Sequence, residues 1–135
     1  DLESRTFGVV VDTSGSMSAK QIGMALGSIA SYAAAKDVPF VRIIFCDAKA
    51  TDAGYLAPED IAGRVKVTGR GGTILQPGVD CLEQANDFPK DGPILIITDG
   101  EIENDLKVRR EHAFLLPRGN RLPFRARGEV FYFRE

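Results

Sequence analysis

The sequence lacks the features that mark several common classes of protein. Its two cysteines, Cys46 and Cys81, show neither the CxxC spacing nor the Cys/His spacing of a zinc or redox site. Both lie inside apolar segments, so we expect buried free thiols. No run of about 18 apolar residues is present, and the N-terminus lacks a charged segment followed by an apolar one, so neither a membrane span nor a signal peptide is visible.

Catalytic signatures are missing as well. His112 is the only histidine, and without a second histidine or a nucleophile–base pair a Ser-His-Asp triad has little support. We expect His112 to be a structural residue at the start of a strand. The glycine-rich segment 69–73 lacks the Gly-Lys-Ser/Thr ending of a P-loop, and no GxGxxG follows the first apolar run, so neither phosphate-binding motif is present.

Neither sign of charge dominates the chain. With 17 basic and 19 acidic residues the net charge is −2, which argues against general nucleic-acid binding. The distribution is uneven: residues 1–105 carry 9 basic and 16 acidic side chains, and residues 106–135 carry 8 and 3. We interpret the basic part as a solvated face with extra arginines; the alternative is that the two parts face different surroundings.

Apolar runs that alternate with helical patterns predict one α/β domain, with a doubly wound, mostly parallel, Rossmann-like sheet and helices on both faces. The predicted strands are 7–11, 40–46, 93–98, 112–116 and 129–133, with a short edge strand at 51–56. The predicted helices are 18–36, 58–64, 76–88 and 102–110. In such sheets, ligands bind at the carboxyl ends of the strands, near the point where the strand order reverses.

Oxygen-bearing side chains are predicted at that edge. Asp12, Ser14 and Ser16 directly follow the first predicted strand. Asp99 follows a second buried strand, and Thr73 lies in the glycine-rich loop before a helix. If these five residues meet, their oxygens suit Mg²⁺, Mn²⁺ or Ca²⁺, whereas two carboxylates without a cation would repel each other. Taken alone, the first segment also fits an ordinary turn or helix N-cap.

Three separated motifs resemble the von Willebrand factor A (vWA) fold with its metal-ion-dependent adhesion site (MIDAS). They are D-T-S-G-S-M at 12–17, G-G-T at 71–73 and T-D-G-E at 98–101, in the order of the family. The resemblance implies that Ser14, Ser16 and Thr73 ligate the metal through their hydroxyls. It implies that Asp12 and Asp99 bind the metal directly or through water. Mg²⁺ is the expected ion, with Mn²⁺ and Ca²⁺ as alternatives.

The resemblance also implies that the vacant metal position takes an acidic side chain from a protein partner. The expected rim for that partner comprises Gly15, Met17, Asp47, Gly72 and Glu101. Several of these residues also fit plain turns or caps, because Asp and Gly are common there. One departure from the family is that Ile74 and Leu75 follow Thr73, where bacterial relatives often place an acid, and this departure affects the charge of the rim.

The chain further resembles compact bacterial vWA-like domains at the C-terminus of larger proteins, which accompany metallopeptidase-like regions or AAA-type ATPases. This resemblance rests on F-C-D-A at 45–48 and on a C-terminal half that is short for an adhesion domain. It implies that residues 1–135 form a single vWA-like domain of a longer, cytoplasmic protein. A chain that begins at Asp1 rather than Met agrees with that expectation.

We therefore expect a non-enzymatic, divalent-cation-dependent protein-interaction module, with no nucleic-acid partner. One alternative is a Mg²⁺-dependent hydrolase or phosphotransferase, since Mg²⁺ beside an aspartate also serves phosphoryl transfer. Asp12-x-Ser14 differs, however, from the Asp-x-Asp of aspartyl-phosphate enzymes. The other alternative is a structural domain with a degenerate site.

Overall fold

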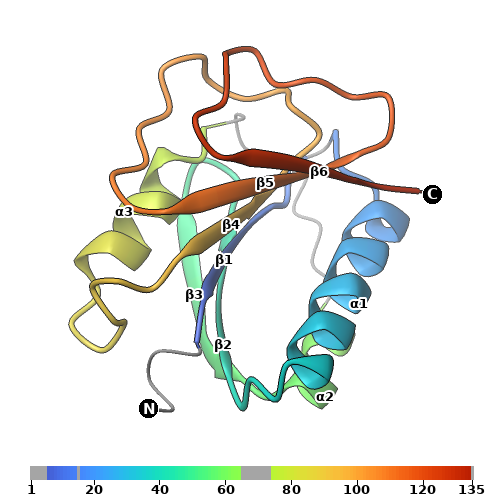
Figure 1. Cartoon of the computed structure of the whole chain (residues 1–135). Helices are drawn as coiled ribbons and strands as arrows, with labels where there is room; N and C mark the ends of the chain where they lie inside the picture. The colour runs from blue at the N-terminus through green and yellow to red at the C-terminus, as the bar shows by residue number, and fades with distance from the viewer. Residues whose placement is uncertain (1–5, 15, 65–73, 135) are drawn as a thin grey trace.

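The centre of the sheet is apolar on both of its faces. The computed structural model describes residues 6–14, 16–64 and 74–134 (Figure 1). The strands are β1 (Gly8–Asp12), β2 (Val41–Cys46), β3 (Ala50–Leu56), β4 (Ile94–Ile97), β5 (His112–Pro117) and β6 (Glu129–Phe133). Every residue of β1 and β2 is buried, as expected for parallel strands that are covered on both faces.

The strands of the described ranges form one sheet in the order β3-β2-β1-β4-β5-β6. All neighbouring pairs are parallel except β2 and β3, which are antiparallel. The predicted α/β class and the mostly parallel sheet are therefore confirmed. The predicted edge strand is also present, as β3.

Helices cover both faces of the sheet around β1 and β2. They are α1 (Ala19–Ala35), α2 (Pro58–Ile61) with a following 3-10 turn (Ala62–Arg64), and α3 (Gln76–Gln84). Figure 1 shows α1 and α2 on one side of the sheet and α3 on the other. None of the helices in the described ranges has the length and apolar character that a membrane crossing needs.

The sequence explains why α1 begins and packs where it does. Ser18 forms a capping box, in which its hydroxyl accepts from the Gln21 backbone and the Gln21 side chain accepts from the Ser18 backbone. The buried residues of α1 recur at steps of three and four, which places one stripe on the sheet: Ile22, Ala25, Leu26, Ile29 and Ala33. Asp37 follows the helix with a φ of 56°, outside the helical region.

The helix α3 lies unusually close to the sheet because of one glycine. A Cβ at Gly78 would lie 2.8 Å from the Val10 side chain and 3.1 Å from that of Cys46. Leu75, Val79 and Leu82 are fully buried around this contact. The helix ends at Gln84, four residues before the predicted end at residue 88. The helix α3 therefore covers less of its face of the sheet than the sequence predicted.

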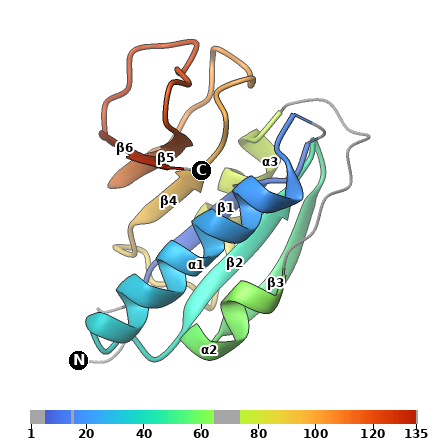
Figure 2. The same cartoon turned by 90° about the vertical axis from the view of Figure 1, so that its right-hand side faces the viewer.

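The predicted helix at 102–110 is wrong, because this described segment is irregular. Its side chains alternate between exposed and half-buried from 105 to 111, which is the period of an extended chain. Leu106 and Val108 pack on the core beneath α3. The connection 118–128, between β5 and β6, contains no helix either. Figure 2 shows both connections arching over β4, β5 and β6.

Candidate functional site

The strand order reverses beside β1. Val11 pairs with Phe45 of β2 on one side and with Ile97 of β4 on the other. The chain thus proceeds from β1 to β2 and β3, and later returns to the opposite side of β1 as β4. Asp12 and Thr98 lie at the carboxyl ends of β1 and β4, so they flank the crevice where sheets of this type bind ligands.

Asp12 is fully buried, and both of its carboxylate oxygens accept hydrogen bonds. The Ser14 backbone N–H donates to Oδ1 at 2.9 Å, and the Thr98 hydroxyl donates to Oδ2 at 2.7 Å. Burial raises the pKa of Asp12, and the nearby charge of Asp99 adds to the increase, whereas the hydrogen bonds from Ser14 and Thr98 oppose it. A cation at this place would offset the cost of burying the charged form.

The loop after β1 brings two hydroxyls together. The Oγ atoms of Ser14 and Ser16 lie 3.1 Å apart, within hydrogen-bonding distance. Ser14 is buried and Ser16 is exposed. The Met17 backbone N–H donates to the Ser14 carbonyl at 3.1 Å, which closes the turn that carries both side chains. The predicted grouping of Asp12, Ser14 and Ser16 at one strand end is therefore present.

Asp99 is held beside Asp12 by a tight turn after β4. Its side chain accepts from the Glu101 backbone N–H at 3.0 Å, and the residue is 4% exposed. The Thr98 hydroxyl, which donates to Asp12, also accepts from the Gly100 N–H at 3.1 Å. Gly100 has a φ of +92°, and a Cβ there would lie 1.8 Å from the carbonyl oxygen of Arg121. Only glycine fits this position of the T-D-G motif.

The described residues of the predicted rim differ in their exposure. Glu101 is exposed, and Asp47 is half-buried after β2. Met17 is instead fully buried in the core beneath α1, which corrects its assignment to a partner-binding rim. The remaining predicted site residues lie outside the described residues: Gly15, Gly72 and Thr73.

The position directly after Thr73 is nevertheless fixed. The Ala48 backbone N–H donates to the Ile74 carbonyl at 3.2 Å, so the turn after β2 contacts the start of α3. Glu103 reaches the same place from the loop after β4. Its carboxylate accepts from the backbone N–H groups of Leu75 and Gln76 at 2.9 to 3.0 Å. Glu103 thereby joins the segment after Asp99 to the N-terminus of α3.

Three of these supporting residues were missed from the sequence: Thr98, Glu103 and Asn120. Thr98 lies inside the T-D-G-E motif, so its hydroxyl was a visible signal. Asn120 donates from Nδ2 to the Asp99 carbonyl at 2.9 Å, across 21 residues of sequence. Nothing local marks Asn120 or Glu103, since their partners are set by the folded chain.

The donors of the candidate site are all oxygens. Among the described residues, no three His, Cys, Asp or Glu side chains gather as they would in a metal centre rich in carboxylates or thiolates. What gathers instead is a pair of acids with serine hydroxyls. This donor set fits a hard divalent cation such as Mg²⁺ and does not fit a soft one.

A six-stranded, mostly parallel sheet with helices on both faces is consistent with the class of VWA-like α/β domains. The model of the family described as VWA-like domain (DUF2201) matches residues 7–110, and the chain belongs to this family. The crystal structure of an aerotolerance-related membrane protein from Bacteroides fragilis NCTC 9343, with multiple mutations to serines, is similar to this chain. The TM-score is 0.68 at 15% identity, over 95% of this chain and 90% of that one.

At that identity the structural likeness shows the fold alone. No curated protein matches the sequence. The resemblance to the vWA fold that the motifs indicated is confirmed by the family match and by the fold. Domains of this class generally mediate protein–protein interactions.

Proposed function

We propose that this domain binds a protein partner through a divalent cation. Asp12, Ser14, Ser16, Thr73 and Asp99 would hold the ion, with Mg²⁺ as the expected metal. One position would stay open for an aspartate or glutamate of the partner. The observation that supports this most strongly is the fully buried Asp12, oriented by Thr98 and lying beside Asp99 at the switch point of the sheet.

The chemistry of the donor set explains why the partner group would be acidic. Neutral hydroxyls fill coordination positions without cancelling the charge of the ion, and a carboxylate that binds through water cancels less of that charge than one bound directly. The bound metal would therefore supply an electrophilic position that attracts a further carboxylate. The role of this chain's residues is to orient: Thr98 fixes Asp12, and the Glu101 backbone fixes Asp99.

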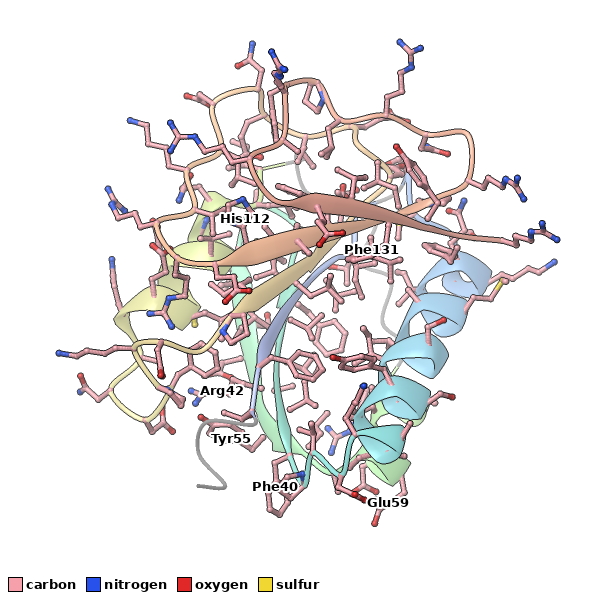
Figure 3. The ribbon with its side chains drawn as sticks, viewed as in Figure 1. Phe40, Arg42, Tyr55, Glu59, His112 and Phe131 are labelled. Atoms are coloured by element: carbon pink, nitrogen blue, oxygen red, sulfur yellow. The ribbon has the colours of Figure 1, made fainter. Side chains whose placement is uncertain are left out.

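A hydrolase would need a general base beside the metal, and the geometry does not favour one. His112 begins β5 and pairs in register with Ile94, the first residue of β4. It therefore lies at the opposite end of the strands from Asp12 and Asp99. Figure 3 labels His112 on β5. Its Nδ1 is 2.8 Å from the Arg110 carbonyl, which supports a structural role.

The test is metal-dependent stability. A cation present at about 100 times its Kd should stabilise the folded domain by about 2.7 kcal/mol. Thermal melting is compared with Mg²⁺, Mn²⁺, Ca²⁺ and EDTA for the wild type and for Asp12→Asn, which keeps the shape of the side chain but removes its charge. The matched control is Asp60→Asn, an exposed acid of α2.

We expect metal to raise the melting temperature of the wild type and of Asp60→Asn but not that of Asp12→Asn. Partner protein retained on the immobilised domain in Mg²⁺ should elute with EDTA. Full retention in EDTA would exclude a metal-bridged interaction. An equal metal response in the two variants would remove Asp12 from the site.

A further inference from the structure

Beside the candidate site, the edge of the sheet carries a depression of about 630 Å³. It lies between β6 and the first residues of the connection that follows β5. The residues that give it its character are Arg118, Asn120, Arg121, Phe131, Tyr132 and Arg134, and we name it the basic groove. Figure 3 labels Phe131, which marks β6 at the outer edge of the sheet.

The three arginines of the basic groove are exposed and have no carboxylate partner among the described residues. The described ion pairs of arginine involve Arg42 and Arg109, which lie elsewhere. The groove thus concentrates positive charge in a domain whose net charge is −2. Unpaired cations that converge on one depression provide a site for an anionic ligand.

Two aromatic side chains lie exposed in the same place. Phe131 is 50% exposed and Tyr132 is 54% exposed. Aromatic residues and arginine are the types enriched in protein–protein interfaces, whereas exposed lysine and glutamate are depleted there. The groove therefore combines charge for recognition with apolar area for contact.

The basic groove is joined directly to the candidate metal site. Its Asn120 side chain donates to the Asp99 carbonyl at 2.9 Å. The carbonyl oxygen of Arg121 packs against Gly100, where even a methyl group has no room. The wall of the groove and the turn that carries Asp99 are thus one packed unit. A single extended segment that enters the metal site can continue into the groove.

The strand β6 is open to such a segment. Among the described strands, it pairs with β5 on one side and has no neighbour on the other. An edge strand presents backbone donors and acceptors that an added extended chain can pair with. An extended ligand is therefore better suited to this groove than a compact one.

We propose that the basic groove binds an acidic, extended segment of the same partner whose carboxylate completes the metal site. This inference rests on the proposed function. Further acids of that segment pair with Arg118, Arg121 and Arg134, and its apolar side chains contact Phe131 and Tyr132. A protein segment is favoured over a nucleic acid because the chain is acidic as a whole.

The experiment measures binding of a fluorescein-labelled peptide of glutamate residues by fluorescence anisotropy, in Mg²⁺ and in EDTA. A glutamine peptide of the same length is the uncharged probe. The groove variant is R118E/R121E/R134E. The control variant, R64E/R125E/R127E, changes the net charge equally at exposed arginines that do not line the groove.

We expect the groove variant to bind the glutamate peptide at least about tenfold more weakly than the wild type, because three exposed ion pairs become repulsive. The control variant should stay within about twofold of the wild type. Equal weakening in both variants would overturn the inference, since net charge alone would then explain binding. A mixed-sequence oligonucleotide that displaces the peptide from the wild type at lower concentration would also overturn it.

The two proposals fail in different ways. If the peptide binds equally in Mg²⁺ and EDTA but is lost in the groove variant, the basic groove stands and the metal-dependent function fails. If binding requires Mg²⁺ but the groove variant binds as tightly as the wild type, the metal-dependent function stands and the basic groove fails. A second variant, R118Q/R121Q/R134Q, removes the positive charges without reversing them and should also weaken binding, so the test survives if the charge reversals impair folding.

Discussion

The two halves of the sheet are covered by different kinds of structure. Around β1, β2 and β3 the cover is helical, and α1, the longest helix, satisfies most of its own backbone hydrogen bonds. Over β4, β5 and β6 the connections 98–111 and 118–128, both fully described, form no helix (Figure 2). The backbone there lacks the repeating hydrogen bonds of a helix, and side chains bond part of the first connection instead.

These side chains belong to α3. The Gln76 amide donates to the Lys107 carbonyl and accepts from the Lys107 N–H, at 2.9 and 2.8 Å. The Glu83 carboxylate accepts from the Arg109 N–H at 2.7 Å. In return, Glu103 accepts from the first N–H groups of α3. The comparison shows that one short helix, α3, holds the irregular connection 98–111 through a few side-chain hydrogen bonds.

Among the changes to the irregular connections over β4, β5 and β6, Gly100→Ala should destabilise the domain most. Its Cβ would overlap the Arg121 carbonyl at a positive φ, so we expect a loss of about 3 kcal/mol or more in the free energy of unfolding. Gly119→Ala is the control, because Gly119 also has a positive φ but no neighbour within 4 Å. Urea denaturation measures both. A similar, small loss in the two variants would show that the connection and the Asp99 turn are not packed as described.

Replacing a leucine by alanine compares how tightly the helical and the irregular segments pack on the sheet. Leu26 lies fully buried on the face of α1 that packs on the sheet, and Leu26→Ala should cost about 3 kcal/mol. Leu106 is half-buried in the irregular connection, and Leu106→Ala should cost about 1 kcal/mol. Both values come from urea denaturation. Equal costs would mean that the irregular cover is packed as tightly as the helical one.

Glu103→Gln tests whether a side chain holds the irregular cover to α3. The carboxylate accepts charge-assisted bonds from Leu75 and Gln76, so its neutralisation should cost about 1 kcal/mol. Hydrogen exchange of the amides at 102–110 should become faster. Asp105→Asn, at an exposed acid of the same segment, should change neither quantity. Unchanged exchange in Glu103→Gln would contradict the role of this residue.

The two edges of the sheet differ in how their charges are paired. The pH dependence of stability tests this difference. Arg42 donates to both oxygens of Asp52 on β3, at 3.0 and 2.6 Å, and this lowers the pKa of Asp52. Because the folded pKa is depressed, the stabilisation is present above the ordinary value of about 3.9 and is lost as pH falls through the folded pKa. The arginines of the basic groove, next to β6, have no carboxylate partner among the described residues.

We therefore expect wild type to lose more stability on acidification than Asp52→Asn, by about 1 kcal/mol or less because Asp52 is partly exposed. Urea denaturation at several pH values between neutral and acidic measures this difference. Asp60→Asn should follow the wild type. Parallel pH profiles of the wild type and Asp52→Asn would show that Arg42 does not stabilise the ionised form of Asp52.

The helical half was predictable because its signals are local. A capping box at Ser18 and an apolar stripe define α1, and continuous apolar runs define β1 and β2. The irregular half was harder. Residues 102–110 contain good helix formers, yet their backbone is bonded by Gln76 and Glu83, which lie more than twenty residues earlier. These long-range hydrogen bonds outweigh the helix propensity of the segment, and no periodic pattern in the sequence marks them.

The candidate site was predictable at its strand ends and not beyond them. Asp12 and Asp99 follow apolar runs, so the strand-end rule located both. Met17 was misplaced because its position in the motif suggested the rim, while its apolar side chain turned into the core. Asn120 lies outside every motif, and only the folded chain brings it to Asp99.

The bond from Thr98 to Asp12 joins residues 86 positions apart, and this separation has a consequence for biogenesis. The strand β1 is made well before its neighbour β4, because residues 13–93 are translated between them. Contacts so distant in sequence form late, since the chain between them must be ordered first. The crevice therefore becomes complete only in a domain whose sheet has already assembled, and a ligand held there distinguishes finished molecules from unfinished ones.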